Sequence, residues 1–307
     1  MIPRYELIGK QNPVKPVVAI GNFDGVHCGH QKILNHLKDK AKSKNLDSVV
    51  ITLDKHPQNV LHPEKNLKVL TTKEEKIEIF KSIGIDTIIV IEFNPQTVEM
   101  DAEEFYYALL EGKLEASGIV IGHDHAFGRD RKGNSGFLNK LADKTGIEVI
   151  RVSPAMEGGN PISSTKIREE ILNGNCEKAA HLLGRPYKLN GIVKKGLGRG
   201  KKIGYPTANI ELSAIKPIPL DGVYAVKAYV DKKTLNGMMS IGENMTFGET
   251  KKTMEVNIFD FCEDIYGKEI EVKFISRIRD MQKFDDVNEL ISKLREDERE
   301  TSNIFDQ

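Results

Sequence analysis

Two histidines and several glycines follow a short apolar run near the start of the chain, and together these residues could handle phosphate. The run Val17–Ile20 leads into Gly21, and His27 and His30 follow soon after. A strand, a glycine-lined turn and a helix start form a phosphate site, because glycines let backbone amides approach an anion and the helix N-terminus adds unpaired N–H groups. Imidazoles at 27 and 30 can donate hydrogen bonds to a triphosphate as charge builds on its bridging oxygen.

The alternatives for these two histidines are a metal site and a pair of solvated side chains on a loop. Two histidines three residues apart supply only half of a zinc site, and no Cys or Glu at ligand spacing completes it. The glycine-rich context therefore favours phosphate binding. His123 and His125 flank Asp124 further along the chain, but alternate side chains of an extended segment point to opposite sides, which argues against a metal there.

Three hydroxyl residues at 163–165 open another segment that could bind phosphate, and Lys166 and Arg168 follow them. Hydroxyls, helix N–H groups and two cations in one place form a phosphate clamp. Taken alone, the hydroxyl run is typical of a plain helix N-cap, and the basic residues within 129–132 are typical of a solvated turn. Because these segments also follow apolar runs, we expect them to form one nucleotide site together with the first loop.

The elements that position these residues are predicted by five apolar runs with helical patterns between them. The runs are residues 17–20, 48–53, 87–91, 118–121 and 148–152. Alternation of this kind is typical of a parallel sheet with crossover helices, so we expect a doubly wound α/β domain. Ligands bind at the carboxyl ends of the strands in such sheets, where all of the polar segments above fall.

Helix boundaries are also marked in this half. An apolar period near 3.6 predicts a helix over residues 30–44. Thr72 and Glu75 have the spacing of a capping box, and Asp101 marks another helix start. Gly84 and Gly146 stand where helices are expected to end.

Length and composition favour a two-domain protein that binds small ligands. The chain has 307 residues, and 45 basic side chains balance 45 acidic ones, so no bulk positive field favours nucleic acid or an anionic membrane. Cys28, Cys176 and Cys262 are odd in number and far apart, which indicates free thiols in a reducing compartment. The first ten residues lack the apolar core of a signal peptide and no window could span a bilayer, so we expect a cytoplasmic protein.

The pattern changes near Arg185, where short β-rich runs replace the alternation. The runs are residues 188–194, 222–230, 235–241, 253–261 and 270–276. Several strands at this spacing predict a small antiparallel β-barrel, and an amphipathic helix at residues 285–298 is expected to pack against it. We therefore place the domains at residues 1–184 and 185–307.

The second half has its own candidate site. Glycines between cations in residues 196–204 predict a loop that could close over phosphates. Thr207 and Asn209 are two apart, and thus on one side of an extended segment, and supply oxygens suited to Mg2+. Glu255 by itself is typical of a strand carboxylate on a solvated face.

Together these segments resemble one family. GNFDGVHCGHQ and ISSTKIR are similar to the adenylyltransferase half of the bacterial bifunctional riboflavin kinase/FAD synthetases, and the first loop also resembles the HxGH element of the wider nucleotidylyltransferase superfamily. GYPTAN, residues 204–209, resembles the riboflavin kinase signature. The resemblance covers nearly the whole chain. It implies that the barrel converts riboflavin and ATP to FMN and ADP, and that the first domain converts FMN and ATP to FAD and pyrophosphate, each with Mg2+.

The resemblance also implies roles for residues of the first half. His27 and His30 would bind the triphosphate of ATP, and Ser164, Thr165 and Arg168 would hold phosphates from the other side. Asp124 would contact the flavin or the nucleotide. The next two residues, His125 and Ala126, replace an aromatic and a basic residue that the family usually has there. The nucleotide pocket would be shaped by Gly21, Asn22, Phe23, Asp24 and Gly25.

In the second half, the resemblance implies that Glu255 is the catalytic base. It would accept the proton of the ribityl hydroxyl as that oxygen attacks the γ-phosphate. Thr207 and Asn209 would hold Mg2+, and Arg279 would lie near the flavin. The remaining implied contacts to ATP and flavin come from Gly196, Gly204 and Pro206.

Two alternatives to a bifunctional enzyme stay open. Lys194, Ser240 and Met245 stand where the family has other residues, so the alternative within the family is an FAD synthetase whose barrel binds flavin but phosphorylates poorly. An RNA-binding or regulatory protein could also reuse the scaffold, since class I tRNA synthetases share an HxGH-type loop. The neutral charge and the lack of a basic arm argue against RNA binding. We therefore expect ATP, riboflavin and FMN as partners, and the sequence indicates no oligomeric state.

Overall fold

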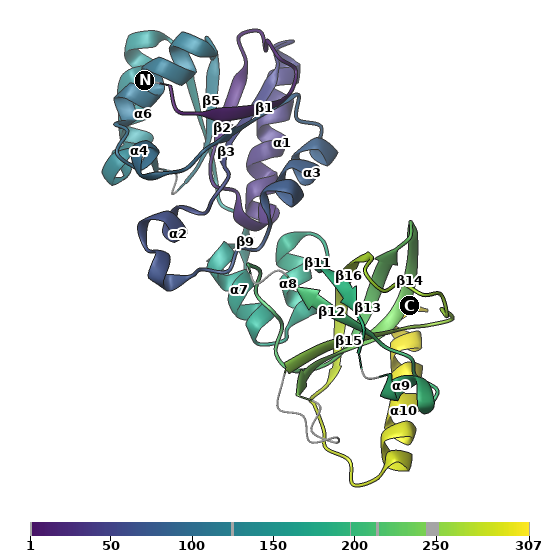
Figure 1. The fold of residues 1–307 in the computed structure, drawn as a ribbon. Helices are drawn as coiled ribbons and strands as arrows, with labels where there is room; N and C mark the ends of the chain where they lie inside the picture. Colours follow the sequence, from purple (N-terminus) through teal and green to yellow (C-terminus); the bar gives the residue numbers. More distant parts are fainter. Residues whose placement is uncertain (1, 124–125, 197, 213–214, 244–251, 307) are drawn as a thin grey trace. The chain divides into compact units, whose positions relative to one another are not determined.

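A six-stranded sheet, in the order β1-β4-β3-β2-β5-β8, forms the centre of the first half of the chain (Figure 1). The computed structural model describes residues 2–123, 126–196, 198–212, 215–243 and 252–306. All strands except β1 run parallel to one another, and β1 runs antiparallel to its neighbour β4. The strands are β1 (Tyr5–Gly9), β2 (Val17–Ile20), β3 (Ser48–Leu53), β4 (Thr87–Ile91), β5 (Gly118–Gly122) and β8 (Glu148–Val152).

Helices cover both faces of this sheet, which confirms the predicted doubly wound α/β domain. On one face, α1 (Cys28–Ser43) and α3 (Lys73–Ile83) bury apolar side chains such as Leu34 and Phe80. On the other face, a continuous stretch of α5 (Ala102–Phe105) and the π-helical η3 (Tyr106–Lys113) packs with α6 (Ser135–Thr145). The five predicted runs all form strands, within one residue of their expected bounds.

The helix signals of the sequence are confirmed where they were expected. Thr72 and Glu75 form a capping box at the start of α3, with both reciprocal hydrogen bonds present. Asp101 caps α5 by accepting a hydrogen bond from the Glu103 amide. Gly84 and Gly146 end α3 and α6 in the left-handed conformation that glycine adopts without steric penalty. Local sequence therefore determines where these helices begin and end.

Short elements connect the main strands and helices of this half. They are η1 (Asp24–Val26), α2 (Pro57–Leu61), η2 (Pro63–Lys65), α4 (Pro95–Val98), β6 (Ala126–Phe127), η4 (Arg129–Arg131), β7 (Gly133–Asn134), β9 (Met156–Glu157) and β10 (Asn160–Pro161).

The second half forms a closed six-stranded antiparallel barrel, which confirms the predicted barrel. The strand order around it is β11-β12-β15-β14-β13-β16, and α9 (Arg199–Lys202) lies between β11 and β12 in the chain (Figure 1). Five of the strands were predicted as runs, and β12 was not. The strands are β11 (Tyr187–Lys194), β12 (Ala208–Leu212), β13 (Gly222–Val230), β14 (Lys233–Glu243), β15 (Lys252–Ile258) and β16 (Glu269–Arg279).

The final helix, α10 (Val287–Phe305), packs against β13, β14 and β16. Asp286 caps its start by accepting hydrogen bonds from the amides of Asn288 and Glu289. The helix continues well past the predicted end at residue 298, because its later turns stay in contact with the barrel: Lys227 of β13 lies over the ring of Phe305.

Contacts divide the chain into two compact units, Met1–Ser164 and Thr165–Gln307. The division comes at the start of α7 (Ser164–Leu172), before α8 (Cys176–Leu183). Helix α8 groups with the barrel because it packs against β11 and β16, where Ser276 donates a hydrogen bond to Glu177. The predicted domains, residues 1–184 and 185–307, assign these two helices to the other half. Among the described residues, no helix combines the length and the apolarity needed to cross a membrane.

Candidate active sites

The turn between β2 and α1 has an unusual backbone. Phe23, Gly25 and Val26 have φ values of +51°, +81° and +38°. Positive φ is unfavourable for residues with a side chain, above all for a β-branched residue such as Val26. A backbone of this kind persists only where its surroundings hold it, and it is often found at functional sites.

Contacts to the segment before α3 hold this turn in place. The Asp24 carboxylate accepts hydrogen bonds from the amides of Leu70 (2.9 Å) and Thr71 (3.2 Å). The Gly25 amide donates to Thr71 Oγ1 at 2.9 Å. The Phe23 ring is buried and packs edge-on against Phe80 of α3. The side chains of Asp24 and Phe23 are therefore engaged in forming the turn.

The turn brings the two histidines together at the start of α1. His27 is the N-cap, and its Nδ1 accepts a hydrogen bond from the His30 amide at 3.4 Å. The two rings stack with their centroids 3.6 Å apart. Gly29 lies so close that a Cβ there would be 3.1 Å from the His27 ring. His30 therefore lies within the first turn of the helix, which begins at Cys28, two residues earlier than predicted.

Other predicted residues of the first half take different positions. Ser164 Oγ donates a hydrogen bond to the carbonyl oxygen of Asp24 at 2.8 Å, so the structure brings Ser164 to the turn. The Gly21 amide donates to the Ile51 carbonyl and continues the β2–β3 pairing. Thr165 and Arg168 lie in α7, in the second unit. Asp124 lies outside the described residues. Among the residues that are described, no three His, Cys, Asp or Glu side chains are grouped as metal ligands would be.

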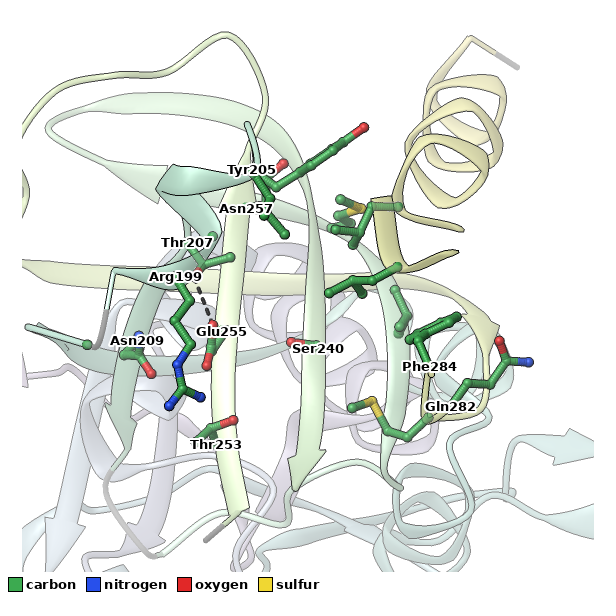
Figure 2. Close-up of a pocket in the computed structure, with 18 of the residues that line it drawn as sticks. Arg199, Tyr205, Thr207, Asn209, Ser240, Thr253, Glu255, Asn257, Gln282 and Phe284 are labelled. Atoms are coloured by element: carbon green, nitrogen blue, oxygen red, sulfur yellow. Dashed lines mark hydrogen bonds between the residues drawn. The ribbon is translucent and has the colours of Figure 1, made fainter. Parts of the chain in front are cut away.

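The barrel contains a cavity of about 260 Å³ that collects most of the predicted residues of the second half (Figure 2). The polar side chains Arg199, Thr207 and Asn209 lie on one side, and Gln282 and Phe284 lie on the other. The apolar part of its lining consists of Ile203, Val223, Met238, Met281, Phe284, Leu290 and Leu294.

Thr207 and Glu255 meet inside this cavity. Thr207 Oγ1 donates a hydrogen bond to Glu255 Oε2 at 2.8 Å (Figure 2). Asn209 opposes Glu255 in the β12–β15 register, so its amide lies next to the pair. The Arg199 side chain extends toward the same group (Figure 2). A hydroxyl, an amide and a carboxylate thus lie together beside a cation, as phosphoryl transfer requires.

Each residue of the segment 205–207 is fixed by a different side chain. Tyr205 donates its hydroxyl to Glu298 of α10 at 2.9 Å, and burial and this hydrogen bond raise the pKa of Tyr205 to about 12. The Pro206 carbonyl accepts a hydrogen bond from Asn257 Nδ2 at 2.7 Å. With the Thr207 contact above, the backbone before β12 is tied to α10 and β15. Sequence reasoning missed Asn257, although it lies two residues after Glu255 and so on the same face of β15.

Glycine at position 196 leaves room for a close approach of the Asn209 side chain. A Cβ there would lie 2.1 Å from Asn209 Nδ2, well inside contact distance. Gly204 has a φ of +87°, so a side chain there would strain the backbone even though the surrounding space is open. The glycines therefore shape the site as well as leaving room for phosphate.

Arg279 forms a buried ion pair that joins β16 to α10. Its Nε and Nη2 donate to the carboxylate of Asp297 at 2.7–3.1 Å, and its Nη1 donates to the Asp280 carbonyl. Asp297 is 1% exposed, and the guanidinium also lies over the Phe284 ring. Arg279 lines the cavity, and much of its hydrogen-bonding capacity is used within the protein.

A second cavity, of about 510 Å³, shares Ile203, Tyr205 and Asn257 with the first. The aromatic side chains Phe259 and Phe261 line it, together with Arg295 of α10. The segment around Tyr205 therefore borders two cavities of the same barrel.

Comparison with known proteins matches the two halves separately. A family model described as FAD synthetase matches residues 9–166, and one described as riboflavin kinase matches residues 183–305. The bifunctional riboflavin kinase/FMN adenylyltransferase of Listeria monocytogenes is 40% identical over 294 residues, which cover 95% of this chain and 93% of the relative. The chain belongs to this family. The family's protein in Bacillus subtilis is 36% identical over 301 residues, covering 96% of this chain and 94% of the relative.

One solved structure also matches the chain nearly end to end. The crystal structure of a Streptococcus pneumoniae protein has a TM-score of 0.85 and 37% identity, and the match covers 96% of each chain. That protein carries the name macrolide-efflux protein. As a member of the bifunctional family, the present chain combines a nucleotidyltransferase-type unit with a riboflavin kinase-type barrel, in the order that the sequence resemblance implied.

Proposed function

We propose that this chain makes FAD from riboflavin in two ATP-dependent steps. The barrel transfers the γ-phosphoryl group of ATP to riboflavin and forms FMN and ADP. The first unit transfers AMP from ATP to FMN and forms FAD and pyrophosphate. The observation that best supports this proposal is the Thr207–Glu255 hydrogen bond at an apolar-lined cavity, within a chain that belongs to the bifunctional family.

In the kinase step, Glu255 accepts the proton of the ribityl hydroxyl as that oxygen attacks the γ-phosphate. The phosphate must be held in line with the hydroxyl, and positioning supplies most of the rate enhancement in such transfers. The Arg199 side chain extends toward the Thr207–Glu255 pair, where it would balance phosphate charge (Figure 2). Apolar residues such as Met238, Met281 and Leu290 would pack against the flavin ring. We place the adenine in the second cavity, beside Phe259 and Phe261.

The donor atoms around Glu255 are those that Mg2+ prefers. Thr207 Oγ1 and the Asn209 side-chain oxygen would hold the ion, and Gly196 leaves the space that lets Asn209 lie there. When bound, Mg2+ would neutralise and orient the phosphates of ATP. Because the Thr207 hydroxyl proton is donated to Glu255, the Thr207 oxygen keeps its lone pairs for a cation.

In the adenylyl transfer step, the attacking group is the phosphate of FMN, which is already an anion. A strong base is therefore unnecessary, and positioning with charge stabilisation suffices. The stacked pair His27 and His30 would donate hydrogen bonds to the triphosphate at the start of α1. Ser164, whose Oγ donates to the Asp24 carbonyl, would hold phosphate beside the same turn, and Thr165 and Arg168 keep the phosphate-binding roles that the resemblance implies. The free state of the three cysteines supports a reducing compartment, so we propose a cytoplasmic location.

A product analysis tests both steps. The full chain is incubated with riboflavin, ATP and Mg2+, and the flavins are separated by chromatography; FMN and then FAD are expected. A second incubation with FMN and ATP is expected to give FAD and pyrophosphate in equal amounts, and a chelator is expected to stop both reactions. FAD formation from FMN without any phosphorylation of riboflavin would instead favour the alternative of an FAD synthetase whose barrel binds flavin but phosphorylates it poorly. The departure from the family pattern at Ser240 suggests that alternative. Absence of both products would contradict the proposal.

A further inference from the structure

Lys76 of α3 lies buried behind the strained turn of the first unit, where only 4% of its surface is exposed. Its Nζ donates to the carbonyl oxygens of Leu53 (2.7 Å) and Asn22 (3.2 Å) and to Thr52 Oγ1 (3.4 Å). Asn22 lies two residues after the end of β2, and Leu53 ends β3. One ammonium group thus connects the carboxyl ends of two neighbouring strands, at the edge where ligands bind in such sheets.

Burying this charge costs desolvation free energy. An ammonium has three N–H donors, and here all three meet neutral oxygens. Within the described part of the chain, no carboxylate forms an ion pair with it, although Asp24, Asp54 and Glu74 act on it from a distance. Burial lowers the pKa of Lys76 to about 8 despite these three carboxylates. A buried cation that lacks an ion-pair partner is rarely explained by stability alone.

The turn that Lys76 contacts is the one that needs support. Its strained residues, Phe23, Gly25 and Val26, follow Asn22 immediately, and His27 follows them. Asp24 and Gly25 are held from the segment before α3 by Leu70 and Thr71. Lys76 holds the other end of the turn from within α3, five residues after Thr71.

We propose that Lys76 is a positioning residue for adenylyl transfer, whose ammonium fixes the Asn22 carbonyl and so holds the turn that presents His27 and His30. The inference rests on the function proposed for the first unit. Lys76 does not touch the nucleotide in this role. It acts by keeping the two imidazoles in the geometry that the transition state requires, where a misplacement of about 1 Å can cost on the order of 100-fold in rate.

A pH profile distinguishes this role from a purely structural one. Because the pKa of Lys76 is lower in the folded chain than the ordinary 10.5, the unfolded chain binds the additional proton between about pH 8 and 10.5, and the linked stability rises with pH in that range. The neutral amine has only two N–H donors, so above about pH 8 it can donate to at most two of the three oxygens. Positioning therefore predicts that adenylyl transfer falls while this contribution to stability rises.

The experiment compares three variants of the full chain, with both activities measured in each. Lys76→Met removes the ammonium, Lys76→Arg keeps the charge at high pH, and Lys81→Met is the matched control, because Lys81 is exposed on the same helix. Lys76→Met is expected to lower kcat for FAD formation from FMN by roughly 10- to 100-fold, with a smaller change in KM. FMN formation in the same chain, and both activities of Lys81→Met, are expected to be unchanged.

The pH profiles complete the test. The unchanged chain is expected to lose FAD formation above about pH 8, and Lys76→Arg, if active at neutral pH, to retain it there. Equal FAD formation by Lys76→Met and the unchanged chain would overturn the inference. If Lys76→Met fails to fold, identical pH profiles for Lys76→Arg and the unchanged chain would overturn it instead, as would an Arg variant that folds but is inactive at every pH. An unchanged chain that forms no FAD at any pH would refute the proposed function itself.

Discussion

The hydrogen bond between Thr207 and Glu255 sets how each side chain can meet a substrate. Thr207 has a single hydroxyl proton, and Glu255 Oε2 accepts it. The threonine therefore acts only as an acceptor toward other groups, which suits a cation. The glutamate is oriented by a neutral hydroxyl donor rather than by a cation.

Glu255→Gln is expected to stop FMN formation while FAD formation from supplied FMN continues. Glutamine can still accept the Thr207 hydrogen bond through its amide oxygen, so the geometry is kept and only the base is lost. General-base catalysis contributes typically 10²–10⁴-fold, and kcat for riboflavin phosphorylation is expected to fall by about that factor. Glu211→Gln, at an exposed carboxylate of β12, is the control. A nearly unchanged kcat in Glu255→Gln would refute the assigned base.

His30→Ala is expected to have the opposite effect. The substitution removes the imidazole that stacks on His27, so the triphosphate loses a hydrogen-bond donor in the first unit. FAD formation from FMN is expected to fall by on the order of 100- to 1000-fold, as when a donor to developing negative charge is removed. FMN formation, measured in the same preparation, is expected to stay nearly intact. Loss of both activities in a variant that still folds would contradict separate roles for the two sites.

At the scale of elements, the buried Arg279–Asp297 pair joins β16 to α10. The side chains are 13% and 1% exposed, so solvent screens the pair weakly. Asp297→Asn leaves the guanidinium buried without a counter-ion, and the free energy of unfolding of the barrel is expected to fall by about 3–5 kcal/mol.

Denaturant unfolding of the barrel, monitored by its own spectroscopic transition, checks this expectation. Asp280→Asn removes a partner of Arg277 whose side chain is 81% exposed, and it is expected to cost less than about 1 kcal/mol. A similar loss in both variants would mean that the buried pair has no special role in attaching α10.

The elements that sequence reasoning missed are those whose formation depends on partners elsewhere. β1 (Tyr5–Gly9) exists because it pairs antiparallel with the edge of β4, and its own residues alternate weakly between buried and exposed. β12 follows Thr207 directly, and the sequence indicated only an extended segment around Thr207 and Asn209; the strand forms by pairing with β11 and β15. By contrast, the parallel strands were predictable because burial on both faces makes them continuous apolar runs.

The candidate sites show the same limit. His27, His30 and Thr207 were found because residue type and spacing indicate chemistry before folding, whereas Glu255 was found only through the family resemblance. Lys76 and Asn257 hold those residues in place, but each is a single polar side chain within an ordinary helix or strand. Their importance comes from acceptors far away in the sequence, such as Asn22 for Lys76, and only the folded chain brings these together.

At the scale of the whole molecule, two separate sites predict that two damaged chains can complement each other. His30→Ala alone is expected to accumulate FMN from riboflavin, and Glu255→Gln alone is expected to form no product from it. A mixture of the two variants is expected to form FAD after a lag, because FMN released by one chain is used by the other. Chromatography of samples taken over time measures this. A mixture that accumulates FMN without FAD would show that FMN cannot pass between chains.

The closed barrel affects which part of the molecule begins to associate with other chains on heating. Every strand in it has two neighbours, whereas the sheet of the first unit ends in two outer strands, β1 and β8. Exposed outer strands can pair with other chains, so association between partly opened molecules is expected to begin at the first unit. On slow heating, the ability to adenylylate FMN should therefore disappear while the ability to phosphorylate riboflavin persists, and assays of both on the same heated sample would reveal that order.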